Sequence, residues 1–214
     1  MKQEIYTMIS QEVINKNGLN GVYYLGKLME LINAFRPNSI EEWESDYCSW
    51  ARQTGQDARI TEAIDRAFNI CLQRGIEVSR EEVREAFWRR TIRDCWIGRE
   101  RELKCADWLR LQGLKVETVD DETDRKYGVD LIVYDNEGNV LLGVQVKGNA
   151  YFYRAENKER DEINPKKYKK FRAQYGVGVV EVGYNDKGEL SHNKTALELA
   201  LGLRQVPQYE CFNF

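Results

Sequence analysis

Three polar side chains at the ends of two strand-like runs have the types and spacing needed to hold a metal ion and activate water. Asp130 is the second residue of the apolar run 129–134, and Gln145 and Lys147 lie two residues apart in the next apolar run. Residues i and i+2 of a strand point to the same face. The asparagine- and glycine-containing turn at 135–139 predicts a hairpin, which brings Asp130 beside the other two side chains. A carboxylate, an amide oxygen and an ammonium group are therefore expected to converge at one edge of a sheet.

These groups suit Mg²⁺-assisted attack of water on a phosphodiester. A buried carboxylate costs free energy unless a cation or a partner compensates it. Mg²⁺ prefers a few protein oxygens and keeps several waters. The ion lowers the pKa of a bound water and stabilises charge developing on phosphorus, while Lys147 can orient the attacking water or help to deprotonate it. Taken singly, Asp130 can simply cap a turn and Lys147 can simply end a strand, so the interpretation depends on their occurring together.

The order of these residues resembles the core of the PD-(D/E)XK nuclease superfamily, in which a helix presents a glutamate before a strand Asp and a strand (D/E/Q)-x-K. The resemblance rests on residues 98–113 (GRERELKCADWLRLQG), 127–133 (YGVDLIV) and 144–148 (VQVKG). It implies catalytic roles for Glu102, Asp130, Gln145 and Lys147. It also implies a Mg²⁺ site, at which Mn²⁺ can substitute, formed by Asp130, Gln145, Glu102 and the backbone carbonyl of Val146. Gln145 replaces an acidic residue of the motif, which weakens metal binding and leaves the number of ions open.

Two glutamates compete for the helix position of this motif. Ala106 and Leu109 lie four and seven residues after Glu102, so Glu102 is on the helix stripe that faces the sheet. We therefore prefer Glu102 to Glu100.

A longer resemblance is to the MjaI family of type II restriction endonucleases. It is carried by residues 21–35 (GVYYLGKLMELINAF), 39–47 (SIEEWESDY) and 91–102 (TIRDCWIGRERE). The family places a helical region before the nuclease core and cuts short palindromic DNA. The resemblance implies a sequence-specific, Mg²⁺-dependent endonuclease acting on double-stranded DNA. Because a palindrome is cut on both strands, a symmetric homodimer with two active sites is expected.

The sequence around these residues shows two patterns, one helical and one rich in strands. Apolar residues at helical spacing predict helices over 21–35 and 57–74, and capping-box spacings at Ser39/Glu42 and Ser79/Glu82 predict two helix starts. After Gly113 we expect strands at 114–119, 129–134, 140–147 and 177–182, and helices at 165–175 and 194–204. This order predicts an α/β (α+β mixed-sheet) fold with a restriction-endonuclease-like core, a mixed β-sheet flanked by helices. We expect a helical DNA-recognition or dimerisation region at 1–97 and the nuclease core at 98–214.

Local basic patches are the candidate DNA contacts, because 32 basic and 35 acidic residues give a net charge of only −3. The run 165–172 holds five basic residues and no acidic one, and arginines 89–101 form a second cluster. The residues selected for DNA contact are Arg99, Arg101, Tyr151, Tyr153, Arg154, Lys166, Lys167, Lys169 and Lys170. The acidic run 120–124 is expected to lie away from DNA or to supply further metal oxygens.

Composition excludes several other classes. The single histidine, His192, argues against zinc sites and Ser-His-Asp triads, and it is expected in a solvated loop. Five cysteines without a CxxC pair are typical of reduced thiols in a cytoplasmic protein. No apolar stretch is long enough to span a membrane, and no phosphate-binding loop indicates a nucleotide cofactor.

Two other functions fit the same residues. A homing endonuclease or Holliday junction resolvase would use this core on a different DNA. A DNA-binding protein that keeps the nuclease fold without cleaving is the alternative from another class, and the replacement at Gln145 favours it.

Overall fold

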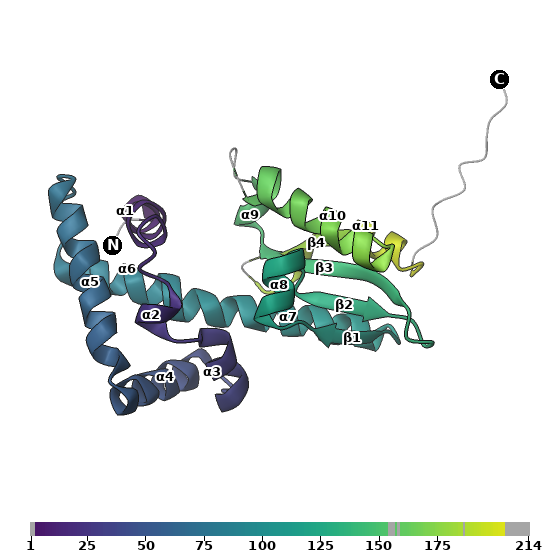
Figure 1. Ribbon diagram of the computed structural model, residues 1–214, viewed down its shortest axis with the longest axis horizontal. Helices are drawn as coiled ribbons and strands as arrows, with labels where there is room; N and C mark the ends of the chain where they lie inside the picture. Colours follow the sequence, from purple (N-terminus) through teal and green to yellow (C-terminus); the bar gives the residue numbers. More distant parts are fainter. Residues whose placement is uncertain (1–2, 154–156, 158, 186, 204–214) are drawn as a thin grey trace, which may run out of the picture. The chain divides into compact units, whose positions relative to one another are not determined.

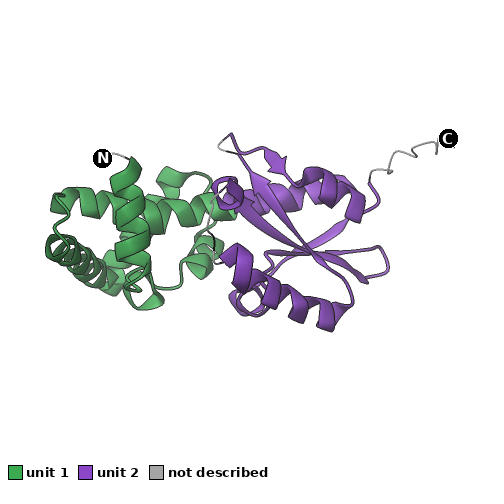
Figure 2. Ribbon diagram, turned by 90° about the horizontal axis from the view of Figure 1, so that it is seen from above, with its two compact units in different colours: residues 1–99 green, residues 100–214 purple. Residues whose placement is uncertain are grey.

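The computed structural model describes residues 3–153, 157, 159–185 and 187–203. The chain divides into two compact units, residues 1–99 and 100–214, and each is described by itself (Figure 2). Within the described residues, no helix combines the length and the apolar character that crossing a membrane requires.

The first unit is helical, in accord with the sequence pattern. Its elements are α1 (Gln3–Met8), the π-helix η1 (Ile9–Asn15), α2 (Val22–Leu25), α3 (Leu28–Phe35), α4 (Ile40–Thr54), α5 (Gln56–Gln73), α6 (Arg80–Trp88), the π-helix η2 (Arg89–Arg93) and the start of α7 (Asp94–Leu111). One apolar core joins these helices, and its largest fully buried side chains include Trp43, Tyr47 and Phe87. The aromatic residues at helical spacing in α4 therefore serve packing, as their periodicity predicts.

Two helix starts follow the expected capping chemistry to different degrees. At α6, Ser79 and Glu82 form the complete reciprocal capping box. At α4, the Ser39 hydroxyl accepts from the Glu42 amide at 3.1 Å, but the Glu42 carboxylate accepts from the Asn38 amide at 2.7 Å. At α4, the Glu42 carboxylate therefore bonds to the amide of the residue before Ser39 and not to that of Ser39 itself.

The single helix expected over 21–35 is wrong, because the chain breaks at Gly26. Gly26 has φ 71°, a backbone conformation that side chains disfavour. A Cβ there would lie 2.5 Å from the Trp50 ring of α4. The close approach of Trp50 therefore separates α2 from α3.

The second unit is a five-stranded mixed sheet with helices on both faces, as the fold-class prediction requires (Figure 1). Its elements after α7 are β1 (Lys115–Thr118), α8 (Asp121–Tyr127), β2 (Leu131–Tyr134), β3 (Val140–Gly148), α9 (Ala150–Tyr153), the π-helix η3 (Glu159–Ile163), α10 (Asn164–Tyr175), β4 (Val179–Tyr184), β5 (Leu190–His192) and α11 (Lys194–Ala200). The strands lie in the order β1-β2-β3-β4-β5, and only the β3–β4 pair is parallel. Helix α10 makes the crossover that this parallel pair needs.

Two apolar clusters separate the faces of the sheet. Val144 and Val146 of β3 pack in one cluster with Cys105 and Leu109 of α7. Phe171 of α10 packs in the other cluster, which also contains Tyr127 of α8 and Ile132 of β2. Helices α7 and α10 accordingly lie on opposite sides of the sheet (Figure 1). Because side chains alternate along β3, Gln145 and Lys147 face the α10 side.

Four short elements were not expected from the sequence. The acidic run after β1 forms α8, with the Asp120 carboxylate accepting from the Thr123 amide at 2.8 Å. Helices α9 and η3 lie between β3 and α10, where no element was assigned. The expectation of a solvated loop at His192 is wrong: it ends β5, and its ring stacks on Phe152 with the centroids 3.8 Å apart.

Candidate functional site

The position of Asp130 is fixed by a sharp change of chain direction. Helix α8 ends at Gly128, which has φ 66° and whose amide donates to the Asp124 carbonyl. A Cβ at Gly128 would lie 3.0 Å from the Lys167 side chain. Glycine is therefore favoured here both by the positive φ and by the lack of space for a side chain. The chain then enters β2, and the Asp130 amide donates to the Val144 carbonyl at 2.9 Å. This bond sets Asp130 against the middle of β3.

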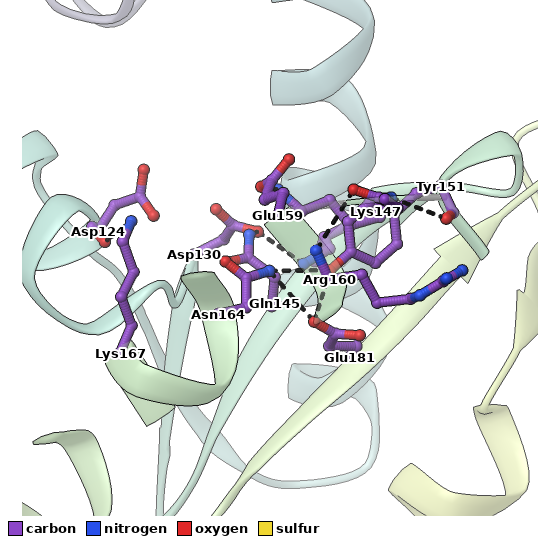
Figure 3. A network of polar contacts seen from close by, with 12 residues as sticks. Asp124, Asp130, Gln145, Lys147, Tyr151, Glu159, Arg160, Asn164, Lys167 and Glu181 are labelled. Carbon is purple, nitrogen blue, oxygen red and sulfur yellow. Dashed lines mark hydrogen bonds and ion pairs between the residues drawn. The ribbon is translucent and has the colours of Figure 1, made fainter. Parts of the chain in front are cut away.

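The Asp130 carboxylate is half-buried and held by two donors of β3. Its Oδ2 atom accepts from the Gln145 side-chain amide at 2.5 Å and from the Val146 backbone amide at 2.6 Å (Figure 3). Burial, followed by repulsion from the Glu102 carboxylate, raises the pKa of Asp130 to about 8 from its ordinary 3.8. The fold therefore holds this carboxyl where negative charge is disfavoured, as expected where a cation binds.

The two candidate helix glutamates of α7 differ clearly. Glu100 is exposed, and its carboxylate pairs with Lys104 at 2.9 Å. Glu102 is half-buried and acts electrostatically on Asp130. The structure thus brings Glu102, rather than Glu100, to the Asp130 carboxylate.

Lys147 lies on the same face of β3 as Gln145, among carboxylates. Its Nζ atom donates to the Glu159 carboxylate of η3 at 2.9 Å, and its side chain is 23% exposed. Burial disfavours the charged ammonium, but Glu159, Asp130 and Asp124 together outweigh burial and raise the pKa of Lys147. The lysine is therefore a cation at neutral pH.

Asp124 and Lys167 form the outer side of this cluster (Figure 3). Burial raises the pKa of Asp124, and the charges of Lys167 and Lys147 oppose that shift. The Lys167 ammonium donates to the Asp124 backbone carbonyl at 3.3 Å. Asp124 belongs to the acidic run that the sequence singled out as a possible source of further oxygens, and its side chain acts electrostatically on Asp130.

A second buried polar network lies beside Gln145, on the neighbouring strand. Glu181 of β4 is the direct register partner of Gln145. Its Oε1 atom accepts from the hydroxyls of Tyr151 at 2.8 Å and Tyr168 at 2.5 Å, and from the Asn164 amide at 3.2 Å. The sequence did not reveal this network, although a lone glutamate in the apolar run of β4 was a signal for it.

The donor set suits Mg²⁺, with one limit on its present arrangement. The Glu102 and Asp130 carboxylates, the Gln145 amide oxygen and the Val146 carbonyl are the hard oxygen ligands that this ion takes. Among the described residues, no three His, Cys, Asp or Glu side chains are grouped closely enough to hold a metal. Ligation by Gln145 also requires its amide to rotate, because its nitrogen now faces Asp130. The donors therefore fit Mg²⁺ chemically, with neutral oxygens and waters completing the shell.

The residues selected for DNA contact fall into distinct environments. Lys166, Lys169 and Lys170 are exposed on α10, whereas Lys167 is half-buried. Tyr153 is 74% exposed, whereas Tyr151 is only 8% exposed. Arg99 and Arg101 are half-buried, and Arg154 lies outside the described residues. The Arg101 guanidinium packs against Gly148 at the end of β3, where a Cβ would lie 2.7 Å from its Nη1 atom. Arg101 thus lies next to the predicted site.

Comparison with known proteins gives one result that covers most of the chain. The family model described as MjaI restriction endonuclease matches residues 7–187, a range that holds most of the helical unit and every candidate site residue named above. Neither the curated proteins nor the solved structures provide a match. The resemblance drawn from the sequence is thereby confirmed. The chain belongs to the MjaI restriction endonuclease family, whose members are nucleases with DNA as their substrate.

Proposed function

We propose that this protein is a type II restriction endonuclease that cuts both strands of a short DNA palindrome in a Mg²⁺-dependent reaction. The observation that carries the proposal is the meeting of Glu102, Asp130, Gln145 and Lys147 around one half-buried carboxylate, in a chain of this family. Enclosed titratable groups with shifted pKa values that lie near specific charge partners are typical of functional sites.

The protein groups have separate roles in this proposal. Asp130, Glu102, the Gln145 amide oxygen and the Val146 carbonyl hold Mg²⁺, which lowers the pKa of water and stabilises charge on the phosphate. Lys147, kept cationic by its carboxylate neighbours, binds the scissile phosphate and orients the attacking water. The two hydrogen bonds from Gln145 and Val146 fix the Asp130 carboxylate before metal and DNA arrive.

The exposed face of α10 supplies the DNA backbone contacts in this proposal. Lys166, Lys169 and Lys170 are exposed, and no acidic residue lies on α10. The other face of the helix is fixed to the sheet by Phe171 and by the Tyr168–Glu181 hydrogen bond. The cations thus stand on a rigid element beside the site, where they can neutralise phosphates.

Two further features of the proposal follow from the reaction. A homodimer would place two active sites in the two-fold arrangement of a palindrome, with the helical region contributing to dimerisation or base recognition. We also propose a cytoplasmic location, with which the unbridged thiols of Cys48, Cys71 and Cys105 agree.

The test is cleavage of a panel of plasmid and phage DNAs by the purified protein in Mg²⁺, in Mn²⁺ and in EDTA. Discrete fragments that require the metal ion, and that disappear for Lys147→Ala, are the expected result. The termini of these fragments give the site, its symmetry and the stagger. Cutting only at long sites, or only at branched DNA, would instead indicate the homing or junction-resolving activity.

A folded wild-type protein that shifts DNA on a gel but leaves it intact would overturn the nuclease proposal. The non-cleaving alternative is favoured by one observation, the Gln145 amide that faces Asp130 where the nuclease motif has an acidic residue. Restoring the acid with Gln145→Glu distinguishes the two cases. In a nuclease this variant tightens Mg²⁺ binding and keeps activity, and in a binding protein it creates no cleavage.

A further inference from the structure

Lys147 has a second neighbour besides its carboxylate partners. Its ammonium lies 5.5 Å from the centroid of the Tyr151 ring, within the range of a cation–π contact (Figure 3). Tyr151 is only 8% exposed, so this contact is largely shielded from water. Shielding strengthens the attraction between a cation and an aromatic face.

The Tyr151 ring is itself fixed at its hydroxyl end. The hydroxyl donates to Glu181 at 2.8 Å and accepts from the side-chain amide of Asn164 at 2.9 Å. Asn164 is 2% exposed, and Tyr168 donates to the same Glu181 oxygen. Three elements, β4, α9 and α10, therefore meet at one carboxylate that determines where the ring lies.

The two neighbours of Lys147 differ in what happens when DNA arrives. Glu159 carries a negative charge, and its side chain is 49% exposed on the short helix η3. An incoming phosphate is also an anion, so it competes directly with Glu159 for the ammonium. The Tyr151 ring is neutral and buried, and it retains its contact when the carboxylate is displaced.

We infer that Tyr151 is a positioning residue that holds the Lys147 ammonium in place for catalysis, and that Glu181 fixes the Tyr151 ring through its hydroxyl. This inference rests on the proposed nuclease function. It gives Tyr151 a role inside the protein, since its ring and hydroxyl are already engaged there. Tyr153, two residues later and 74% exposed, keeps the DNA-contact role.

The experiment measures single-turnover cleavage at saturating DNA, together with DNA affinity in EDTA, for variants at position 151. Tyr151→Phe retains the ring, and its rate is expected to stay within about threefold of wild type. Tyr151→Leu removes the ring, and its rate is expected to fall by about tenfold, the effect of a shielded cation–π contact. Affinity for DNA is expected to be unchanged in both.

The same unit contains a matched control at the other end of β2. The Tyr134 ring lies 5.5 Å from the Lys115 ammonium, and its hydroxyl donates to Glu117 at 3.0 Å. Tyr134→Leu therefore removes the same kind of contact far along the strand from Asp130. Its cleavage rate is expected to equal that of the wild type.

A fluorination series at position 151 keeps the test valid if Tyr151→Leu does not fold. Phenylalanine carrying one, two and three fluorines preserves the shape of the ring while weakening its negative face. A stepwise fall in cleavage rate with each fluorine is expected if the ring holds the ammonium. A rate that is independent of fluorine number would overturn the inference.

Glu181 is tested by loss and rescue. Glu181→Ala breaks the same hydrogen bond as Tyr151→Phe, because it removes the acceptor of the Tyr151 hydroxyl. It is therefore expected to slow cleavage by a similar factor, within about threefold. Glu181→Gln restores an acceptor oxygen and is expected to recover most of the rate. Equal loss in both Glu181 variants, with normal folding, would remove Glu181 from the inference.

Failure of the inference is distinguishable from failure of the proposed function. An inactive wild type rejects the function itself. An active wild type whose rate is unaffected by Tyr151→Leu rejects only the role of Tyr151.

Discussion

The two units differ in how they hold charge. In the helical unit, ion pairs such as Lys27–Glu30 at 2.6 Å and Arg84–Glu81 at 2.5 Å join near neighbours in the sequence and leave more than half of each side chain exposed. In the sheet unit, Asp130 and Lys147 are half-buried and lie among further charges. Exposed pairs contribute little to stability, whereas enclosed charges cost free energy that only a specific partner recovers.

The difference also appears in what stabilises each unit. The apolar core stabilises the helical unit. The sheet unit holds a carboxyl whose raised pKa shows that the fold opposes its charge. Substitutions that remove charge should therefore have contrasting effects in the two places.

Asp130→Asn is expected to have the largest effect. Cleavage should fall by about three orders of magnitude, because the metal loses one of its two carboxylate ligands. Without metal the variant should melt no lower than wild type, because its amide oxygen can still accept from Gln145 and Val146. Calorimetric melting in EDTA and single-turnover cleavage check both halves.

The same substitution has a defined pH dependence. Because the pKa of Asp130 rises from 3.8 in the unfolded chain to about 8 in the folded one, the wild type loses stability as pH increases through this interval. The free energy of unfolding of Asp130→Asn, relative to that of the wild type, should therefore increase between about pH 4 and pH 8 and level off above pH 8. A relative stability of the variant that decreases with rising pH would contradict the conclusion that burial raises the pKa of Asp130.

A smaller effect is expected on the exposed face of α10. Replacing Lys166, Lys169 and Lys170 by alanine should weaken DNA binding by roughly tenfold or more. The slope of log affinity against log salt concentration should become shallower by about 0.9 for each phosphate that the variant no longer neutralises. The cleavage rate at saturating DNA should be unchanged. Fluorescence anisotropy at several salt concentrations measures the affinity and its slope.

Lys167→Ala sharpens this test within the same helix. Lys167 is directed to the Asp124 carbonyl and its side chain packs against Gly128, so its removal should leave the salt dependence nearly unchanged. If Lys167→Ala reduced the salt dependence as much as replacement of one exposed lysine does, the exposure of each lysine would not determine its contribution to DNA binding.

The smallest effect is expected in the helical unit. Ser79→Ala removes the hydroxyl of the capping box at the start of α6 and should lower the free energy of unfolding by about 1 kcal/mol. Cleavage should be unaffected at temperatures where the protein stays folded. Chemical denaturation measures the stability, and a change in cleavage rate without a change in folding would couple this helix start to the reaction.

Much of the fold was predictable because its signals are local. Apolar runs and the turn residues between them located β2, β3 and their hairpin, and helical periodicity located α5. The break at Gly26 was not predictable, because it depends on Trp50, a residue that lies 24 positions away in the sequence. Short elements such as β5 were also not predicted, because three residues are too few to show a recognisable alternation.

For the site, the hairpin pattern was enough to predict that Asp130 pairs with Gln145, because a hairpin fixes neighbours by register alone. The stripe of Ala106 and Leu109 likewise indicated the preferred helix glutamate. The groups that enclose Lys147 became clear from the folded arrangement alone. Glu159, Tyr151 and Glu181 come from separate elements, and their meeting depends on how η3, α9 and β4 pack around the end of β3. Local patterns specify periodicity and turns, whereas contacts between distant elements arise from packing, which no short stretch of sequence encodes.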